Sequence, residues 1–210
     1  NMHFYNIKIG LLISCNRPGI GGMLEFYDFI IYALLASYIA KLFLPVASTI
    51  NGVILAFSAY AVGYLARPLG GVIFGHFGDK YGRKKTFTMS MLIMSVSTLL
   101  IGCLPTYETA GATAAILLVF LRLAQGFSVG GEIPGAISYV SEVSPEHTGL
   151  MTAVIFSFLI SGVAIGFIVK GIMLSTFTAD QIMSWAWRIP FVLGGIFGLG
   201  GIFGLGGIFG

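Results

Sequence analysis

Six ionisable side chains lie inside long apolar stretches of this 210-residue sequence. They are Glu25, Asp28, Arg67, Arg122, Glu132 and Lys170. A charge at the centre of a bilayer costs at least ~2.5 kcal/mol, so a residue of this kind usually faces a cavity and marks an ion or substrate path. We therefore look for function first among these side chains.

Glu25 and Asp28 are three positions apart, so in a helix they share one face, with Tyr32 a further turn along. A carboxylate in a low-dielectric environment can bind and release a proton near neutral pH, which is the chemistry that a proton-coupled carrier needs. Asp28 lies deeper in its apolar stretch than Glu25 does. Glu25 could alternatively sit close enough to the membrane surface to be solvated.

The expected counter-charge of Asp28 is Arg122, with Gln125 one helical turn away on the same face. A structural role, in which Arg122 clamps a backbone carbonyl, is the alternative. Glu132 lies about 15 Å further along the same stretch, on another face and at a depth similar to that of Asp28. Arg67 is interpreted as an interfacial anchor whose long side chain reaches water.

The stretches that carry these residues are long enough to cross a membrane. Hydrophobic residues make up 57% of the chain and charged residues 9%, against about 25% charged in an ordinary soluble domain. A span needs about 20 apolar residues. Six such windows occur, at residues 23–44, 51–74, 86–104, 112–140, 150–175 and 189–210. The sequence thus predicts an all-α polytopic membrane protein, with a cytoplasmic segment at 1–22 and a six-helix domain at 23–210.

The densest cluster of charge lies between the second and third windows, at residues 75–85. This turn contains Gly75, Asp79, Lys80, Gly82, Arg83 and Lys84. Cytoplasmic loops carry an excess of Lys and Arg, and most of the basic residues fall on the side that holds this turn and the N-terminus. We therefore place both in the cytoplasm.

Glycine recurs in two patterns. Pairs at four-residue spacing, such as Gly71 with Gly75, Gly126 with Gly130 and Gly162 with Gly166, are typical of close helix packing in membranes. Residues 194–210 repeat the unit Gly-Gly-Ile-Phe-Gly-Leu. That glycine content weakens the sixth predicted helix.

Several motifs resemble the major facilitator superfamily. The pattern Gly-x-x-x-Asp-Lys-x-Gly-Arg-Lys-Lys from Gly75 is similar to the loop between the second and third helices of that superfamily, and residues 122–126 resemble its fourth-helix motif. The metabolite:proton symporter branch is resembled by residues 25–29, 65–71, 130–132 and 187–191. Gly166 is followed by Phe167, which differs from the Gly-Pro pair of drug antiporters.

The resemblance implies one half of a twelve-helix transporter, with the substrate between two six-helix halves. It implies symport of a small polar metabolite with protons by alternating access across a bacterial inner membrane, for compatible solutes such as proline and betaine or organic acids such as 2-oxoglutarate, citrate and shikimate. Proton coupling and the substrate path are then expected at Glu25, Asp28, Arg122, Gln125 and Glu132. Possible substrate contacts are Tyr27 and Tyr32, and Asp79 belongs to a cytoplasmic gating turn.

No nucleophile, base and orienting group can be assembled from the few polar residues, so we do not expect an enzyme. We expect no cofactor and no metal site, with the proton as coupling ion, and a net charge of +3 does not suggest nucleic acid. The expected partners are the bilayer and a small solute. Two alternatives stay open: a truncated fragment that does not transport, or a half-transporter that needs a C-terminal half or a second copy of itself.

Overall fold

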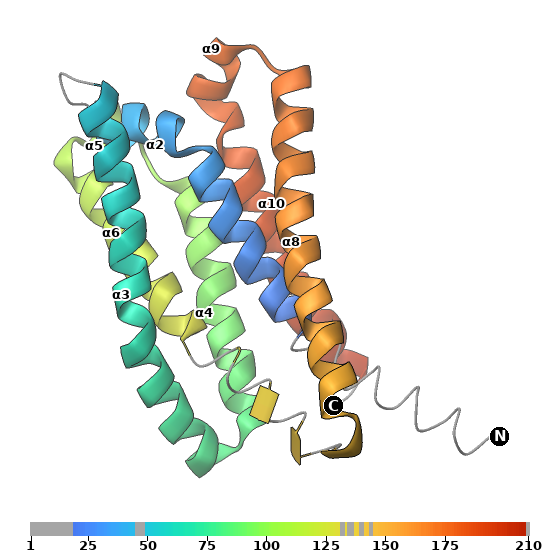
Figure 1. The fold of residues 1–210 in the computed structure, drawn as a ribbon. Coiled ribbons are helices and arrows are strands. Elements are labelled where there is room, and N and C mark those ends of the chain that lie inside the picture. The colour runs from blue at the N-terminus through green and yellow to red at the C-terminus, as the bar shows by residue number, and fades with distance from the viewer. Residues whose placement is uncertain are drawn as a thin grey trace.

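The computed structural model describes residues 19–44, 49–130, 133, 137–138, 141–142 and 145–208. Within these ranges the chain is helical and contains no strand (Figure 1). Its elements are an N-terminal helix (Gly19–Leu34), α2 (Ala36–Phe43), α3 (Thr49–Tyr81), α4 (Arg83–Cys103), α5 (Tyr107–Ala110), α6 (Ala112–Val129), η1 (Pro145–His147), α8 (Thr148–Thr176), α9 (Ala179–Gln181), η2 (Ile182–Ala186) and α10 (Arg188–Ile208).

In the described part of the chain, four helices are each long and apolar enough to cross a membrane, and there are up to six spans if each of two bent pairs counts as one. The N-terminal helix and α2 form one bent pair, with an angle of 67° between them. The segment Ala179–Ala186 and α10 form the other, bent by 45°. The predicted fold class, an all-α polytopic protein with six membrane helices, is confirmed.

Several predicted boundaries differ from those of the helices. Residues 19–22 were expected before the first span but are helical. α3 was expected to end at residue 74 but continues to Tyr81, so most of the charged turn is the last part of a helix. Gly82, with a φ of 95° that favours glycine, separates α3 from α4. α6 is bounded at Val129, and the window predicted to reach residue 140 continues into positions of which 133 and 137–138 are described, all as helical; the other positions of 131–140 lie outside the described residues.

Glycines set the distance between neighbouring helices. A methyl group at Gly126 of α6 would collide with the carbonyl oxygen of Gly63 on α3, and one at Gly130 would collide with the carbonyl of Arg67. Gly162 of α8 lies in the same way against the carbonyl of Met23. The predicted close packing is therefore present at these glycines. It is absent at Gly75, which has open space around it.

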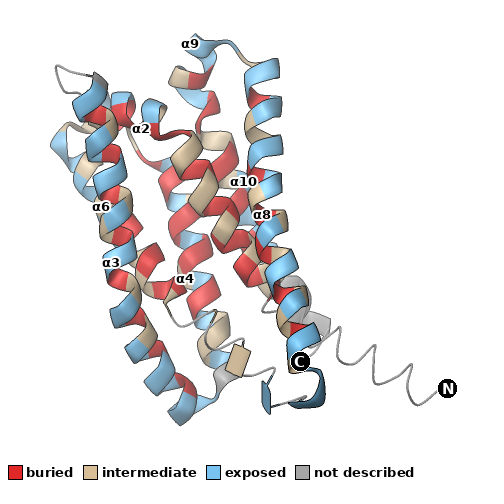
Figure 2. Ribbon diagram, viewed as in Figure 1, coloured by how far each residue is buried: buried red, intermediate tan, exposed pale blue. Residues whose placement is uncertain are grey.

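Burial follows the inner faces of the bundle, whereas the outer faces of α3 and α8 are exposed (Figure 2). Large apolar side chains project from these outer faces, including Leu65 and Val72 on α3 and Ile160 on α8. Such a surface is unfavourable in water and favourable against lipid tails. The apolar exterior leaves the buried polar groups on the inner faces, where a pocket opens.

Candidate substrate and proton path

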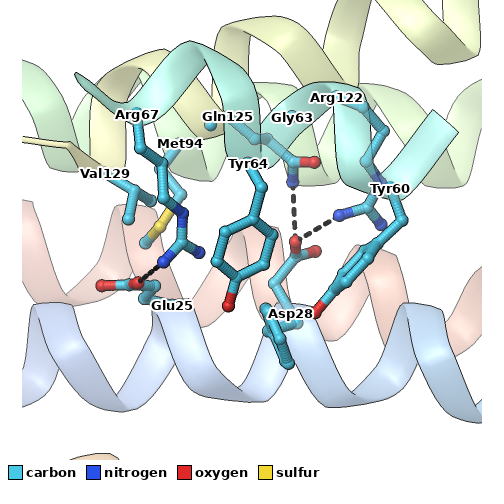
Figure 3. Close-up of a pocket in the computed structure, with 12 residues that line it drawn as sticks. Glu25, Asp28, Tyr60, Gly63, Tyr64, Arg67, Met94, Arg122, Gln125 and Val129 are labelled. Carbon is cyan, nitrogen blue, oxygen red and sulfur yellow. Dashed lines mark hydrogen bonds and ion pairs between the residues drawn. The ribbon is translucent and has the colours of Figure 1, made fainter. Parts of the chain in front are cut away.

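The pocket lies where the N-terminal helix, α3, α4 and α6 meet (Figure 3). Its cavity volume is about 30 Å³, so the pocket is narrow in this structure and has to widen around a solute. Its lining consists of Glu25, Asp28, Phe29, Tyr60, Gly63, Tyr64, Arg67, Met94, Arg122, Gln125, Gly126 and Val129. The close approach of α3 to α6 at Gly63 and Gly126 therefore forms part of the wall.

Asp28 and Arg122 form a buried ion pair in this pocket. Nη1 of Arg122 donates to Oδ2 of Asp28 at 2.8 Å, and Nε2 of Gln125 donates to the same oxygen at 3.0 Å. Gln125 is held in turn by Thr98 of α4, whose Oγ1 lies 2.7 Å from Nε2. The guanidinium of Arg122 also stacks on Tyr32, 3.7 Å from the ring centroid. The three residues grouped from the sequence, Asp28, Arg122 and Gln125, are thus brought together.

Glu25 and Arg67 form a second ion pair, with 3.2 Å between Nη1 of Arg67 and Oε1 of Glu25. The alternative that Glu25 is solvated is wrong, because Glu25 is only 3% exposed. Arg67 is interpreted from the sequence as an interfacial anchor that reaches water; its side chain is 26% exposed and also pairs with Glu25. The cause is the packing of α3, which turns Arg67 toward the N-terminal helix. There a carboxylate and the ring of Tyr64, 3.9 Å from the guanidinium carbon, surround it.

The other predicted contacts lie outside the pocket lining. The hydroxyl of Tyr27 donates to the carbonyl of Pro190 at 2.8 Å, and that of Tyr32 donates to the carbonyl of Ala56 at 3.1 Å. Both tyrosines therefore tie the N-terminal helix to its neighbours. Glu132 lies outside the described residues.

The charged turn does not contribute to the described pocket lining. Asp79 and Lys80 are exposed near the end of α3, where Gly75 and Gly82 are exposed as well. Residues 83–84 begin α4, but their side chains are not among those described. The turn and the pocket are separate features of this half-bundle.

Sequence reasoning missed the aromatic side of the pocket. Tyr60, Tyr64 and Arg67 follow one another at spacings of four and three on α3, so they share a helix face. That periodicity was visible in the sequence and could have placed Arg67 with the tyrosines. Phe29 completes the cluster, with its ring centroid 4.7 Å from that of Tyr60. Thr98 carried no signal, because an isolated threonine in an apolar helix is common.

Buried ion pairs around a pocket between apolar helices define an integral membrane protein of the transporter class. The family model described as "Sugar (and other) transporter" matches residues 16–207, nearly the whole chain. The chain belongs to this family, within the major facilitator superfamily. Its members are transporters, not enzymes, and transport without a cofactor. Among the described residues no cluster of three metal-ligating side chains occurs.

Curated relatives are similar over most of this chain. A Staphylococcus haemolyticus protein with the provisional name proline/betaine transporter is 44% identical over 86% of this chain and 40% of its own length. The shikimate transporter of Escherichia coli is 42% identical over 82% of this chain and 40% of its own. The proline/betaine transporter of Escherichia coli is 39% identical over 88% and 38%. The chain spans about two fifths of the length of these relatives.

Solved structures of the proton:xylose symporter XylE share the fold. The form bound to 6-bromo-6-deoxy-D-glucose superimposes with a TM-score of 0.82 at 17% identity, covering 94% of this chain and 44% of that one. An inward-open form from Escherichia coli gives 0.79 at 18% identity, covering 94% and 47%. The six helices therefore correspond to one half of a twelve-helix transporter.

Proposed function

We propose that this chain supplies the N-terminal half of a proton symporter for a small polar metabolite, either a compatible solute such as proline or betaine or an organic acid such as shikimate. The observation that carries the proposal is the buried network of Asp28, Arg122 and Gln125 beside the pocket. The names of the relatives support the solute classes. The proposed membrane is the bacterial inner membrane. The N-terminus is proposed to lie in the cytoplasm, because Lys80 in the last turn of α3 and the basic residues 83–85 after it favour the cytoplasmic side, two spans away from the N-terminus.

The network suits proton coupling because its charge joins three helices. Asp28 belongs to the N-terminal helix, Arg122 and Gln125 to α6, and Thr98 to α4. A proton on Asp28 removes the negative charge that Arg122 and Gln125 both contact, which weakens the link between the N-terminal helix and α6. Alternating access is largely a rocking of one half against the other around a central site, and a change in this link is proposed to bias that movement. Glu132 is proposed to take part in the same path.

The remaining half of the substrate path is proposed to come from a C-terminal half or from a second copy of this chain. Asp79, near the C-terminal end of α3, is proposed to help hold one access state against that second half. The hypothesis of a fragment that does not transport predicts no uptake under any condition. Crosslinking in membranes tests self-association, and recovery of monomer alone would exclude it.

Uptake in energised membrane vesicles tests the proposal. The chain should be expressed alone and fused to the C-terminal half of the Escherichia coli proline/betaine transporter, with radiolabelled proline, glycine betaine and shikimate as solutes. We expect the fusion to accumulate a solute, and we expect a protonophore to abolish this accumulation. Asp28→Asn should reduce it at least about a hundredfold, because Arg122 loses its charge partner in every step of the transport cycle. The matched control is Asp180→Asn, an exposed carboxylate on α9.

Three results would contradict the proposal. One is the absence of uptake by both proteins. The others are uptake that persists with the protonophore and uptake by Asp28→Asn at the wild-type rate. Activity of the fusion alone would favour a half that needs a C-terminal partner, and activity of the chain alone, together with crosslinked dimers, would favour self-association.

A further inference from the structure

The ion pair of Glu25 and Arg67 is built so that its partners can be exchanged. Its separation of 3.2 Å exceeds the 2.8 Å between Arg122 and Asp28. Three buried atoms of this pair make no hydrogen bond within the described part of the chain. They are the two carboxylate oxygens of Glu25 and Nε of Arg67. Buried polar atoms normally have hydrogen-bond partners. This pair therefore has unused capacity for a polar ligand.

Arg67 is held in the pocket by more than Glu25. Its guanidinium carbon lies 3.9 Å from the ring centroid of Tyr64 and 5.9 Å from that of Phe29. Two ring contacts keep the guanidinium in place when its carboxylate partner changes. A planar guanidinium presents paired N–H groups that match the two oxygens of a carboxylate. The ring contacts thus orient the guanidinium in a way that suits a carboxylate.

Access separates the two arginines of the pocket. The side chain of Arg67 is 26% exposed and that of Arg122 is 4% exposed. A solute that enters the pocket can therefore reach Arg67 while Arg122 stays covered. Nη1 of Arg122 is also engaged with Asp28, which Gln125 binds as well.

We propose that Arg67 binds the carboxylate of the transported solute, and that Glu25 takes up a proton when its arginine passes to that solute. This inference rests on the proposed transport function and names its substrate class, a small solute with a carboxylate group. Proline, betaine and shikimate, the solutes in the names of the relatives, share that group.

The exchange keeps one carboxylate charge beside Arg67. Two carboxylates beside one buried arginine would repel each other at short range, which a low-dielectric site disfavours even where the solute carries a positive charge at its other end, as betaine does. A proton from water forms an O–H bond on Glu25 and removes that charge, while the solute carboxylate takes the place of Glu25 at Arg67. No covalent bond of the solute changes. Release of the solute returns Arg67 to Glu25 and the proton to water, so one proton moves with each carboxylate.

The charged groups around Glu25 leave it as the exchanging carboxylate. Within the described lining they are Asp28 on the same helix, Arg67 on α3 and Arg122 on α6, and the titratable hydroxyls are those of Tyr60 and Tyr64. α4 contributes only Met94 to this lining, and α8 and α10 contribute no titratable group. Asp28 is held by hydrogen bonds from both Arg122 and Gln125, and Arg122 is only 4% exposed. Arg67, at 26% exposed, is therefore the arginine that a solute can reach, and Glu25 is the carboxylate that it would free.

Ligand binding to the purified full chain in lipid nanodiscs tests the proposal. The probe is radiolabelled glycine betaine at pH 5.5, 6.5 and 7.5, and choline, which has the same trimethylammonium group and no carboxylate, is the comparison. We expect betaine binding to tighten by up to about tenfold for each unit of falling pH, as the uptake of one proton requires. Choline should not compete with betaine.

Two variants locate the effect. Arg67→Gln should weaken betaine binding at least about tenfold, because a charged hydrogen-bonding partner is lost. Glu25→Gln replaces the carboxylate by a neutral amide that resembles the protonated acid. It should bind betaine at pH 7.5 at least as tightly as the wild type and with no dependence on pH. The controls Arg188→Gln and Glu108→Gln lie outside the pocket lining and should bind as the wild type does.

The assignment is overturned if the wild-type chain binds betaine neither alone nor fused to the C-terminal half of the Escherichia coli proline/betaine transporter. It is also overturned if choline competes equally, if Arg67→Gln binds normally, or if Glu25→Gln keeps the pH dependence. Uptake separates this proposal from the transport function on which it rests. Proton-driven uptake together with normal binding by Arg67→Gln would overturn the carboxylate site alone. Betaine binding that needs Arg67 without proton-driven uptake would overturn the transport function alone.

Discussion

The carboxylates of Glu25 and Asp28 lie one turn apart on the N-terminal helix, yet their arginines hold them in different ways. Oδ2 of Asp28 accepts two hydrogen bonds, from Arg122 at 2.8 Å and from Gln125 at 3.0 Å. Glu25 has one contact, 3.2 Å from Arg67, and no hydrogen bond within the described residues. The same kind of ion pair therefore occurs in two forms in the pocket. We call the Asp28–Arg122 pair the braced pair, because Gln125 also binds its carboxylate, whereas Glu25 has a single contact.

The difference teaches that the surrounding bundle decides what an ion pair can do. Arg122 comes from α6, which packs on both α3 and α4, so its partners are fixed from several sides. Arg67 comes from α3, whose outer face is exposed, and it lies on the more open side of the pocket. A braced pair suits the joining of helices, and a single contact suits the exchange of ligands.

The largest expected effect follows from removing the arginine of the braced pair. Arg122→Ala should lower the free energy of unfolding by about 3–5 kcal/mol, because Asp28 stays buried and loses its counter-charge. Unfolding by SDS titration from mixed micelles measures the change. The double variant Asp28→Asn with Arg122→Ala is the control and should recover part of the loss, since no buried charge remains. A loss below about 1 kcal/mol would show that the pair is weak, as surface pairs are.

The equivalent change in the second pair should cost less. Arg67→Ala should lower the free energy of unfolding by about 1–3 kcal/mol, because Glu25 loses a single contact of 3.2 Å to an arginine that is already 26% exposed. The same SDS titration measures the loss, with Arg188→Ala as the matched arginine control. A loss equal to that of Arg122→Ala would remove the distinction between the two pairs.

The braced pair could be predicted from the sequence because each partner is recognisable within its own apolar stretch. Asp28 is a deep carboxylate, and Arg122 and Gln125 share a helix face, so few other partners were available. The Glu25–Arg67 pair could not be predicted by the rule that long side chains reach for water, since that rule treats each residue alone. The pairing depends on the rotation of α3 about its axis, which is set where Gly130 meets the carbonyl of Arg67.

The six spans were predictable and the helix ends were less so, for a similar reason. Hydropathy falls after residue 74, but α3 continues to Tyr81 because polar residues can extend a helix beyond the membrane. Pro68 lies inside α3 without ending it. The bend of 67° after Leu34 is marked by neither glycine nor proline at that point. These ends depend on contacts between helices, which a single stretch of sequence does not contain.

The smallest expected effect concerns the ring that supports Arg67. Tyr64→Leu should lower the free energy of unfolding by about 0.5–1 kcal/mol, the usual size of a cation–π contact at a partly exposed site. Tyr64→Phe is the control and should keep most of the stability, because the ring face stacked on the guanidinium remains. A double-mutant cycle with Arg67→Ala isolates the contact. Zero coupling energy would mean that the rings do not hold Arg67, and that Glu25 alone keeps it in the pocket. In that case Arg67 would leave its position in the pocket when a solute replaced Glu25 as its partner. The two pairs would then differ only in how exposed their arginines are.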